Sequence, residues 1–434
     1  MQTVIIRGVS FNLSEGRAYQ VYLMRIALRN LLRRRKRTLL IAGILMLAVL
    51  VFLFLESFMM GIFDLSFDNM IDFETPHITV GRAEYFAEIE EEEEISLEET
   101  FVPEPELLDQ VQELQGFSAL TEVLDFNADF IAGRYDYPVL VRAIELDSFV
   151  GVFKNQEYLV EGEFIEPGDE GVVIGSQLAR FFDLEVGDFY TLRFQDKAGS
   201  FNTLQGEVRG IVTVPHPEMN MSTVFVSRSQ AAAALGLEEG QISQLMVRMA
   251  GRDQAREQAE FLQGQLTGTG FVMRSYRDAS DFLTALEIFG YVEIYFILVL
   301  FLMVGAIGII SALVLAALER VEEIGMMKAL GLKRSQIVRV FLLEAAGIGM
   351  LGGAAGLILG AISVGLLANL GINLDLIMEP EALGLPMAGQ LYGSWNLSSF
   401  LLIFVFVVIL AVVASVVPAY WAASKNPADA IHHR

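Results

Sequence analysis

Four long apolar stretches constrain the fold of this chain more than any other feature of its sequence. They cover residues 39–63, 288–318, 339–370 and 400–421, in a chain of 434 residues of which 53% are hydrophobic. About 20 consecutive apolar residues cross the core of a bilayer as an α-helix, so each stretch is long enough to span a membrane. The sequence therefore predicts a membrane α-helical protein with four transmembrane helices.

The distribution of charge predicts how these helices are oriented. Residues 25–37, just before the first stretch, contain seven basic and no acidic residues. Basic residues mark the cytoplasmic side, so we expect the N-terminus in the cytoplasm, and an even number of spans returns the C-terminus there. The segment 61–287 has 43 acidic and 14 basic residues, a net charge of −29, whereas the rest of the chain carries +5. We expect this acidic segment on the outer side.

These boundaries predict the organisation of the whole chain. A cleavable signal peptide is the alternative for the first span, but the apolar stretch is too long and no A-x-A site follows it. Residues 1–23 precede a second natural start at Met24, and two interpretations stand: an added amphipathic N-terminal segment, or a choice of start site. The predicted order is a cytoplasmic or interfacial segment (1–38), span 39–63, an outer domain with stalk helices (64–287), span 288–318, a cytoplasmic segment (319–338), span 339–370, a short outer loop (371–399), span 400–421 and a cytoplasmic tail (422–434).

The outer segment combines strand and helix patterns. Apolar residues continue the first span through 61–73 as a helix leaving the membrane, and the second span is also longer than a bilayer core, so both should protrude as stalk helices. The clearest patterns predict strands at 137–146 and 206–214 and helices at 175–184 and 252–266. We therefore predict a large mixed α+β extracytoplasmic domain inserted between the first and second spans.

No pattern in the sequence indicates that the chain is an enzyme. There is no G-x-x-x-x-G-K-[ST] loop for ATP and no cysteine, and the four histidines are not spaced as metal ligands. We therefore assign no catalytic or metal-binding residue and expect no cofactor in this chain. His216 lies between two prolines and is interpreted as part of a rigid loop. The acidic block 88–99 is interpreted as a solvated loop or helix edge, with an acidic recruitment surface as the alternative.

The charged segment between the second and third spans has two interpretations. Its charges do not gather on one helical face, and apolar residues lie among them, namely Val321, Ile324, Met327 and Leu330. A helix in water would show a polar face and one on lipid an apolar face, so the mixture favours a contact with another protein. A solvated loop is the alternative. Gly331 fits the end of a helix, and Ser335 fits the N-cap of the next.

The third span carries glycines four residues apart, at Gly349, Gly352, Gly353, Gly356 and Gly360. Without side chains, these positions leave a groove in which another helix can approach closely, so they predict helix packing. Three carboxylates also lie within or near spans, at Glu56, Glu293 and Glu344. They fit either hydrated positions near an interface or a proton or ion pathway.

Three passages resemble the FtsX-like, MacB and Lol type of ABC transporter permease. The most specific is "ERVEEIGMMKALGLKRSQIVRVFLLEAAGIGMLGGAAGLILG" at 319–360. The tail "VVPAYWAASKNPADAI" resembles the end of that family, with Pro418 and Pro427 in the expected places, and "YLVEGEFIEPGDEGVVIGSQLARFFDLEVGD" resembles its outer domain. The resemblance covers nearly the whole chain from Met24.

The resemblance implies a permease that works with partners in a bacterial inner membrane, with its large domain in the periplasm. The expected partners are a dimeric ABC ATPase that binds ATP and magnesium, and a second permease in a homodimer or heterodimer; no nucleic acid is expected. The segment between the second and third spans would be the coupling helix that docks on the ATPase. The coupling residues are then Glu319, Arg320, Glu322, Glu323, Ile324, Gly325, Met327, Lys328, Leu330 and Gly331.

Within the family, layout favours the lipoprotein-releasing Lol permeases. These pass lipoproteins to a periplasmic chaperone while ATP-driven motion is transmitted through the stalk helices. MacB-like efflux of peptides or antibiotics with an adaptor, and FtsX-like control of a cell-wall hydrolase, are the alternatives. The N-terminal extension and the acidic block 88–99 depart from the family pattern.

Overall fold

The computed structural model describes two compact units of the chain. The described residues are 3–6, 9–12, 29, 31, 33, 35–90, 95–166, 168–266, 268–278, 281–319, 333–376 and 387–424. We call one unit the membrane unit; it comprises Met1–Gly61, Ile288–Gly371 and Tyr392–Arg434. The other, which we call the α/β unit, comprises Ile62–Glu287 and Ile372–Leu391.

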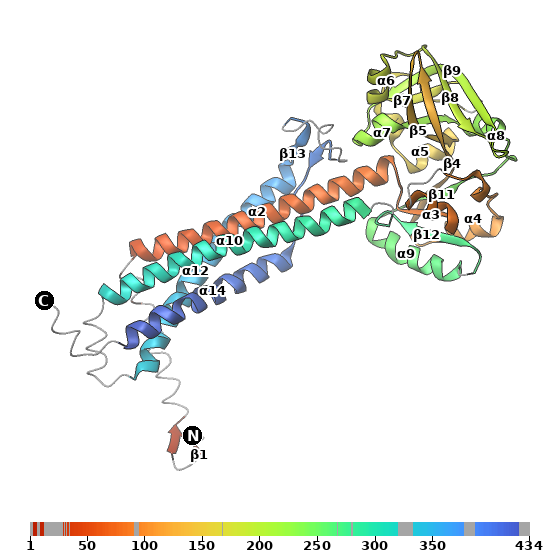
Figure 1. Ribbon diagram of the computed structural model, residues 1–434. Helices are drawn as coiled ribbons and strands as arrows, with labels where there is room; N and C mark the ends of the chain where they lie inside the picture. Colours follow the sequence, from red (N-terminus) through yellow and green to blue (C-terminus); the bar gives the residue numbers. More distant parts are fainter. Residues whose placement is uncertain are drawn as a thin grey trace. The chain divides into compact units, whose positions relative to one another are not determined.

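Within the described residues, four helices are long and apolar enough to cross a membrane, and they confirm the predicted fold class (Figure 1). They are α2 (Arg35–Phe73), α10 (Asp281–Glu319), α12 (Arg334–Leu370) and α14 (Leu397–Ser424). At 1.5 Å per residue, the 39 residues of α2 extend about 58 Å, well beyond a bilayer core of about 30 Å. The predicted helical continuation of the first span is therefore present, because α2 runs unbroken to Phe73.

One row of glycines on α12 faces α2. A methyl group added at Gly352 would lie 2.7 Å from the carbonyl oxygen of Ala42, and one at Gly356 would lie 2.6 Å from the Cβ of Val49. Gly360 is equally close to a leucine of α2. Two backbones can approach this closely only where one of them carries no side chain.

A second row of glycines on α12 faces α14. A methyl group added at Gly349 would lie 3.0 Å from the Cβ of Ala411, and one at Gly353 would lie 3.0 Å from the ring of Phe404. The two rows are adjacent stripes on the surface of α12, because residues three and four apart are neighbours on a helix. The helix thus packs closely against two neighbours at once.

The start of α12 differs from the prediction by two residues. The sequence predicts Ser335 as the N-cap, but α12 begins at Arg334 and Lys333 occupies the cap position. The backbone N–H of Lys333 donates to Oε1 of Gln336 over 2.7 Å, which satisfies the group that precedes the helix. Gln336 therefore does the capping from inside the first turn, with its side chain reaching back.

The α/β unit is built on a ten-stranded mixed sheet (Figure 1). Its strand order is β12-β3-β11-β4-β5-β10-β7-β9-β6, and β8 pairs with β4 and β9. The strands are β3 (Ile78–Arg82), β4 (Phe117–Ala132), β5 (Tyr135–Ile144), β6 (Leu159–Gly162), β7 (Val172–Gly175), β8 (Phe189–Gln195), β9 (Phe201–Val212), β10 (Thr223–Ser227), β11 (Gln244–Met249) and β12 (Phe271–Ser275). Two further antiparallel pairs join β1 (Thr3–Ile6) with β2 (Val9–Asn12), and β13 (Ile372–Asn373) with β14 (Gln390–Leu391).

The 16-residue strand β4 belongs to both halves of this sheet. Its first part pairs with β11, from Phe117 to Val123, and its second part pairs with β5 from Leu124 onward. Each half has its own apolar cluster, one around Ile78 and Leu245 and one around Phe130 and Leu192. The two halves are therefore continuous through a single strand.

Helices and 3-10 turns pack around the sheet, and the helices and strands predicted from local patterns are confirmed. The elements are α3 (Ala83–Glu90), η1 (Leu97–Glu99), α4 (Pro105–Gln112), α5 (Leu146–Val152), η2 (Asn155–Tyr158), α6 (Ser176–Phe182), α7 (Pro217–Ser222), α8 (Arg228–Leu235) and α9 (Arg252–Gln265). A further 3-10 turn, η3 (Leu374–Leu376), contacts β14. The acidic block 88–99 divides between the end of α3, residues 91–94 outside the described residues, and η1. The segment after His216 is not a loop, because Pro217 begins the short helix α7.

We predict that Gly356→Ala destabilises the membrane unit. The added methyl would also lie 2.9 Å from the carbonyl oxygen of Met46, so α12 and α2 must separate, at a cost of about 1–3 kcal/mol for overpacking. Gly43→Ala on α2 is the matched control, since an added methyl there meets no atom within 4 Å. The thermal unfolding midpoint in detergent should fall for Gly356→Ala only; an equal fall in both would contradict the close contact.

Candidate functional site

The structure describes little of the predicted coupling segment. Glu319 is the last residue of α10. The remaining coupling residues lie outside the described residues: Arg320, Glu322, Glu323, Ile324, Gly325, Met327, Lys328, Leu330 and Gly331. Their role in binding an ATPase stays a prediction. The predicted packing glycines are placed against α2 and α14, as described above.

The site that sequence reasoning missed lies at the C-terminal end of α2, inside the α/β unit. A helix leaves its last carbonyl groups without partners in the helix, so an end inside a protein requires donors from elsewhere. The carbonyl oxygen of Ile71 accepts from Nη1 of Arg248 over 3.3 Å. The carbonyl oxygen of Asp72 accepts from the backbone N–H of Lys154 over 3.0 Å. Both donors belong to the α/β unit, from β11 and from the segment after α5.

The next two carbonyl groups are bound in the same way. The oxygen of Phe73 accepts from Nδ2 of Asn155 over 3.3 Å, and the oxygen of Glu74 accepts from Nη1 of Arg142 over 2.7 Å. Four consecutive carbonyl groups at the end of α2 are therefore fixed by the α/β unit. Cationic donors at this end also complement the partial negative charge of a helix C-terminus. We call Arg142, Lys154, Asn155, Arg248 and Arg252 the α2 socket.

Three carboxylates along one face of α2 extend these contacts. Asp64, Asp68 and Asp72 are spaced four residues apart, so they lie above one another on the helix. Nη2 of Arg252 contacts Asp64 over 2.8 Å and its Nε contacts Asp68 over 3.5 Å. Nη2 of Arg248 contacts Asp72 over 2.6 Å. The helix is thus held along two turns as well as at its end.

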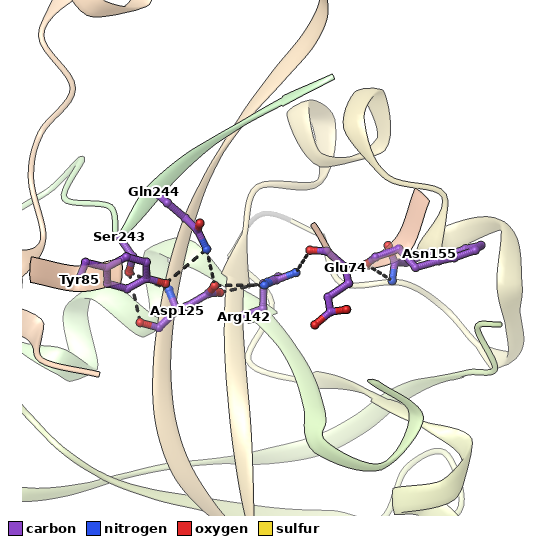
Figure 2. A network of polar contacts seen from close by, with 8 residues as sticks. Glu74, Tyr85, Asp125, Arg142, Asn155, Ser243 and Gln244 are labelled. Carbon is purple, nitrogen blue, oxygen red and sulfur yellow. Dashed lines mark hydrogen bonds and ion pairs between the residues drawn. The ribbon is translucent and has the colours of Figure 1, made fainter. Parts of the chain in front are cut away.

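The arginine at the centre of the socket belongs to a buried polar network (Figure 2). Arg142 donates to both oxygens of Asp125 over 3.1 and 3.2 Å, and both side chains are almost fully buried. Gln244 donates to Asp125 over 2.9 Å and to the hydroxyl of Tyr85 over 3.3 Å, while Ser243 bonds the backbone of Asp125. Removing either member of such a buried ion pair leaves the other as an unpaired buried charge, which strongly destabilises the fold.

The network also sets the charge state of its members. Burial alone would lower the pKa of Arg142, but the charge and hydrogen bonds of Asp125, together with Glu74 and Tyr85, outweigh it and raise the pKa, so the guanidinium stays charged. Burial raises the pKa of the Tyr85 phenol well above its usual value. Since β4, β5 and β11 supply Asp125, Arg142 and Gln244, the charged pair joins both halves of the sheet to the end of α2.

A second ion pair closes the socket on the side of α7. Nε2 of His216 lies 2.8 Å from Oε2 of Glu74, the residue that follows α2. Burial would lower the pKa of His216 and raise that of Glu74, but the two groups reverse both effects: the pKa of His216 is raised and that of Glu74 is lowered. Each group therefore favours the charged form of the other.

Tyr276, the residue that follows strand β12, also contacts α2 and the segment after it. The backbone N–H of Tyr276 donates to the carbonyl oxygen of His77 over 3.1 Å, and the ring of Tyr276 packs edge-on against Phe67 of α2. Burial, followed by the charge of Arg248, lowers the pKa of His77 to about 4. The neutral ring then accepts the backbone N–H of Met249 at Nδ1, over 3.4 Å. The segment between β12 and α10 therefore also contacts α2 close to the socket.

The contacts at this site hold α2 in place. Its charged groups are bonded to one another, and in the part of the chain that the structure describes no three His, Asp or Glu side chains are grouped to hold a metal ion. What the arrangement does is resist rotation, withdrawal and bending of α2 relative to the sheet, because each displacement would break several buried, charge-assisted hydrogen bonds together.

Comparison with known proteins finds similar sequences among membrane permeases. The family described as FtsX-like permease C-terminal matches residues 295–427. An uncharacterised ABC transporter permease of Methanocaldococcus jannaschii is 25% identical over 316 residues, which are 71% of this chain and 72% of that protein. The lipoprotein-releasing system transmembrane protein LolC of Xylella fastidiosa is 21% identical over 318 residues, which are 70% of this chain and 75% of that protein.

Among solved structures, the extracellular domain of the noncanonic ABC-type transporter YknZ from Gram-positive bacteria aligns with part of this chain. The alignment covers 46% of this chain and 99% of that domain, with 14% sequence identity and a TM-score of 0.31.

We predict that Arg142→Met loosens the end of α2. The substitution leaves Asp125 as a buried charge without its partner, a change that typically costs about 3–5 kcal/mol, and removes the donor to Glu74. Hydrogen exchange of the full-length protein, measured by mass spectrometry, should show lost protection in β5 and in residues 62–76. Arg193→Met is the control, because that arginine pairs with Asp129 at the exposed surface and should change little. Unchanged exchange at the end of α2 in Arg142→Met would show that this bond does not hold the helix.

Proposed function

Because this chain is an ABC transporter permease of the FtsX, MacB and Lol type, we propose that it transmits motion from its ATPase partner to its α/β unit through α2. The observation that carries this proposal is the α2 socket, in which four consecutive carbonyl groups at the helix end are bound. A helix held only by apolar contacts could slide or rotate against the sheet. A helix whose backbone carbonyl groups are hydrogen-bonded to the sheet moves the sheet when it moves.

The length and continuity of α2 suit this role. Its residues up to Gly61 belong to the membrane unit, and those from Ile62 belong to the α/β unit. All of these residues lie in one uninterrupted helix that contains no proline. Internal hydrogen bonds make such a helix stiff along its axis, so a displacement in the membrane unit reaches the socket.

We propose that the motion enters at the cytoplasmic side through residues 319–332, docked on a dimeric ABC ATPase that binds ATP and magnesium. In this arrangement the chain itself hydrolyses no ATP, both termini lie in the cytoplasm and the α/β unit lies in the periplasm. A second permease, identical or related, completes the transporter. The basic residues before α2 and the acidic excess of 61–287 support this orientation.

The substrate we propose is a lipoprotein, released from the inner membrane to a periplasmic chaperone. Support comes from the long matches to lipoprotein-releasing transmembrane proteins, LolC of Xylella fastidiosa and LolE of Haemophilus influenzae, over 70% and 60% of this chain. A permease that acts by moving an outer domain can release such a substrate without passing it through the membrane core.

We predict that reversing one charge in the coupling segment weakens the link to the ATPase. Glu323→Lys or Lys328→Glu reverses a charge that we expect to face an opposite charge on the ATPase. The resulting repulsion should weaken binding of the ATPase. Co-purified ATPase and transport-coupled ATP hydrolysis should both fall. Glu287→Lys, an acidic position at the other end of α10, is the control. Unchanged complex and activity would remove the segment from the mechanism.

Depletion of the chain should leave lipoproteins in the inner membrane fraction. Separated membranes, probed for several lipoproteins, measure this directly. Normal sorting would contradict lipoprotein release. Loss of resistance to an exported compound would then indicate efflux, and a defect in cell-wall cleavage would indicate control of a hydrolase.

A further inference from the structure

A buried carboxylate of α2 is bonded to the beginning of α14, within the membrane unit. Glu56 is 8% exposed. Its Oε1 accepts from Nδ2 of Asn396 over 3.1 Å and also from the hydroxyl of Ser399. Asn396 immediately precedes α14, and Ser399 is in its first turn, so the carboxylate of one helix lies at the N-terminus of another. A negative group at this end is stabilised by the unpaired N–H groups and the helix dipole.

These contacts give Glu56 a structural role that the sequence did not indicate. A carboxylate on a relay would be expected to face another titratable group. Here its two hydrogen-bond donors in the described structure are an amide and a hydroxyl, and neither takes up a proton in the physiological range. The arrangement suits a fixed tie between helices.

The segment just before α14 is tied to two further helices through its backbone. The N–H of Ser394 donates to the carbonyl oxygen of Ser57 on α2 over 3.3 Å, and the N–H of Gly393 donates to that of Leu367 on α12 over 3.4 Å. A methyl group at Gly393 would lie 2.8 Å from the side chain of Leu367. The same short segment therefore contacts α2, α12 and α14.

The glycine rows of α12 join these helices along their length. Gly352 and Gly356 bring α12 against α2, and Gly349 and Gly353 bring it against α14. Helix α10 packs less closely, since methyl groups at its Gly305 and Gly308 would lie 3.3 and 3.5 Å from side chains of α2. The close backbone contacts at the glycines and the hydrogen bonds near the start of α14 together resist sliding of the three helices along one another and their separation.

We propose that α2, α12 and α14 move as one rigid body during the transport cycle, and that Glu56 is the positioning residue that fixes their registration. This inference rests on the proposed function, because it describes which helices carry the motion to the socket. It predicts that the contact between Glu56 and the start of α14 never opens. Relative motion within the membrane unit then takes place between this body and α10.

The chain contains no cysteine, so thiols can be placed at chosen positions without background. Glu56→Cys and Ser399→Cys are combined, and the two thiols are bridged with a short bis-methanethiosulfonate reagent that a reductant removes. The transporter, reconstituted with its ATPase, should couple ATP hydrolysis to substrate release equally well with and without the bridge. A loss of about fivefold or more, the low end of coupling between sites, that the reductant reverses would overturn the proposal.

A distance measurement tests the rigid body without relying on coupling, and in protein that keeps Glu56. Spin labels are placed by Leu47→Cys on α2 and Leu401→Cys on α14, both exposed positions. Their distance distribution should stay the same with and without nucleotide, and should broaden when Glu56→Ala is added but not when Glu293→Ala on α10 is added. A nucleotide-dependent shift in the Glu56-containing protein would overturn the proposal. If the protein couples no hydrolysis at all, the proposed function fails while the distances still decide this inference.

Discussion

The structure of the α/β unit depends on how the end of one helix is satisfied. The last carbonyl groups of α2 would be unpaired inside the protein, and each buried polar group without a partner costs about 1–3 kcal/mol. Donors from β5, β11 and the segment after α5 remove that cost. One of them, Arg142, requires Asp125 as its counter-charge, and Asp125 is in turn bonded by Gln244. The helix end and the centre of the sheet therefore stabilise each other.

Much of the membrane unit could be predicted because its determinants are local. A run of apolar residues specifies a span, and glycines four residues apart specify a face without side chains. The structure adds what periodicity cannot supply, namely the partner of each face: Gly352 and Gly356 approach α2, whereas Gly349 and Gly353 approach α14. The spacing of the glycines alone does not indicate which helix each row meets. The coupling segment, the most specific passage in the sequence, lies almost wholly outside the described residues and stays a prediction.

The socket could not be predicted, because its members come together only through tertiary structure. Asp125, Arg142 and Gln244 lie on three strands, and their alignment depends on pairings such as Asp125 with Arg142 across β4 and β5. A partial signal was present in the sequence. Asp64, Asp68 and Asp72 repeat every four residues and so share one face of the helix, a pattern that matches either water or a basic surface opposite them. Only 14 basic residues are present in 61–287, but their sequence positions do not indicate which ones face the helix.

Strand β4 has a consequence for how the α/β unit responds to a pull on α2. Asp125 lies just after the point where β4 exchanges β11 for β5 as its neighbour. A load applied through Arg142 therefore arrives at the seam of the sheet, and it acts on hydrogen bonds of both halves in parallel. Sharing a force among many bonds raises the load that a structure bears before any one bond yields. Under the proposed function, the two halves of the sheet should therefore move together.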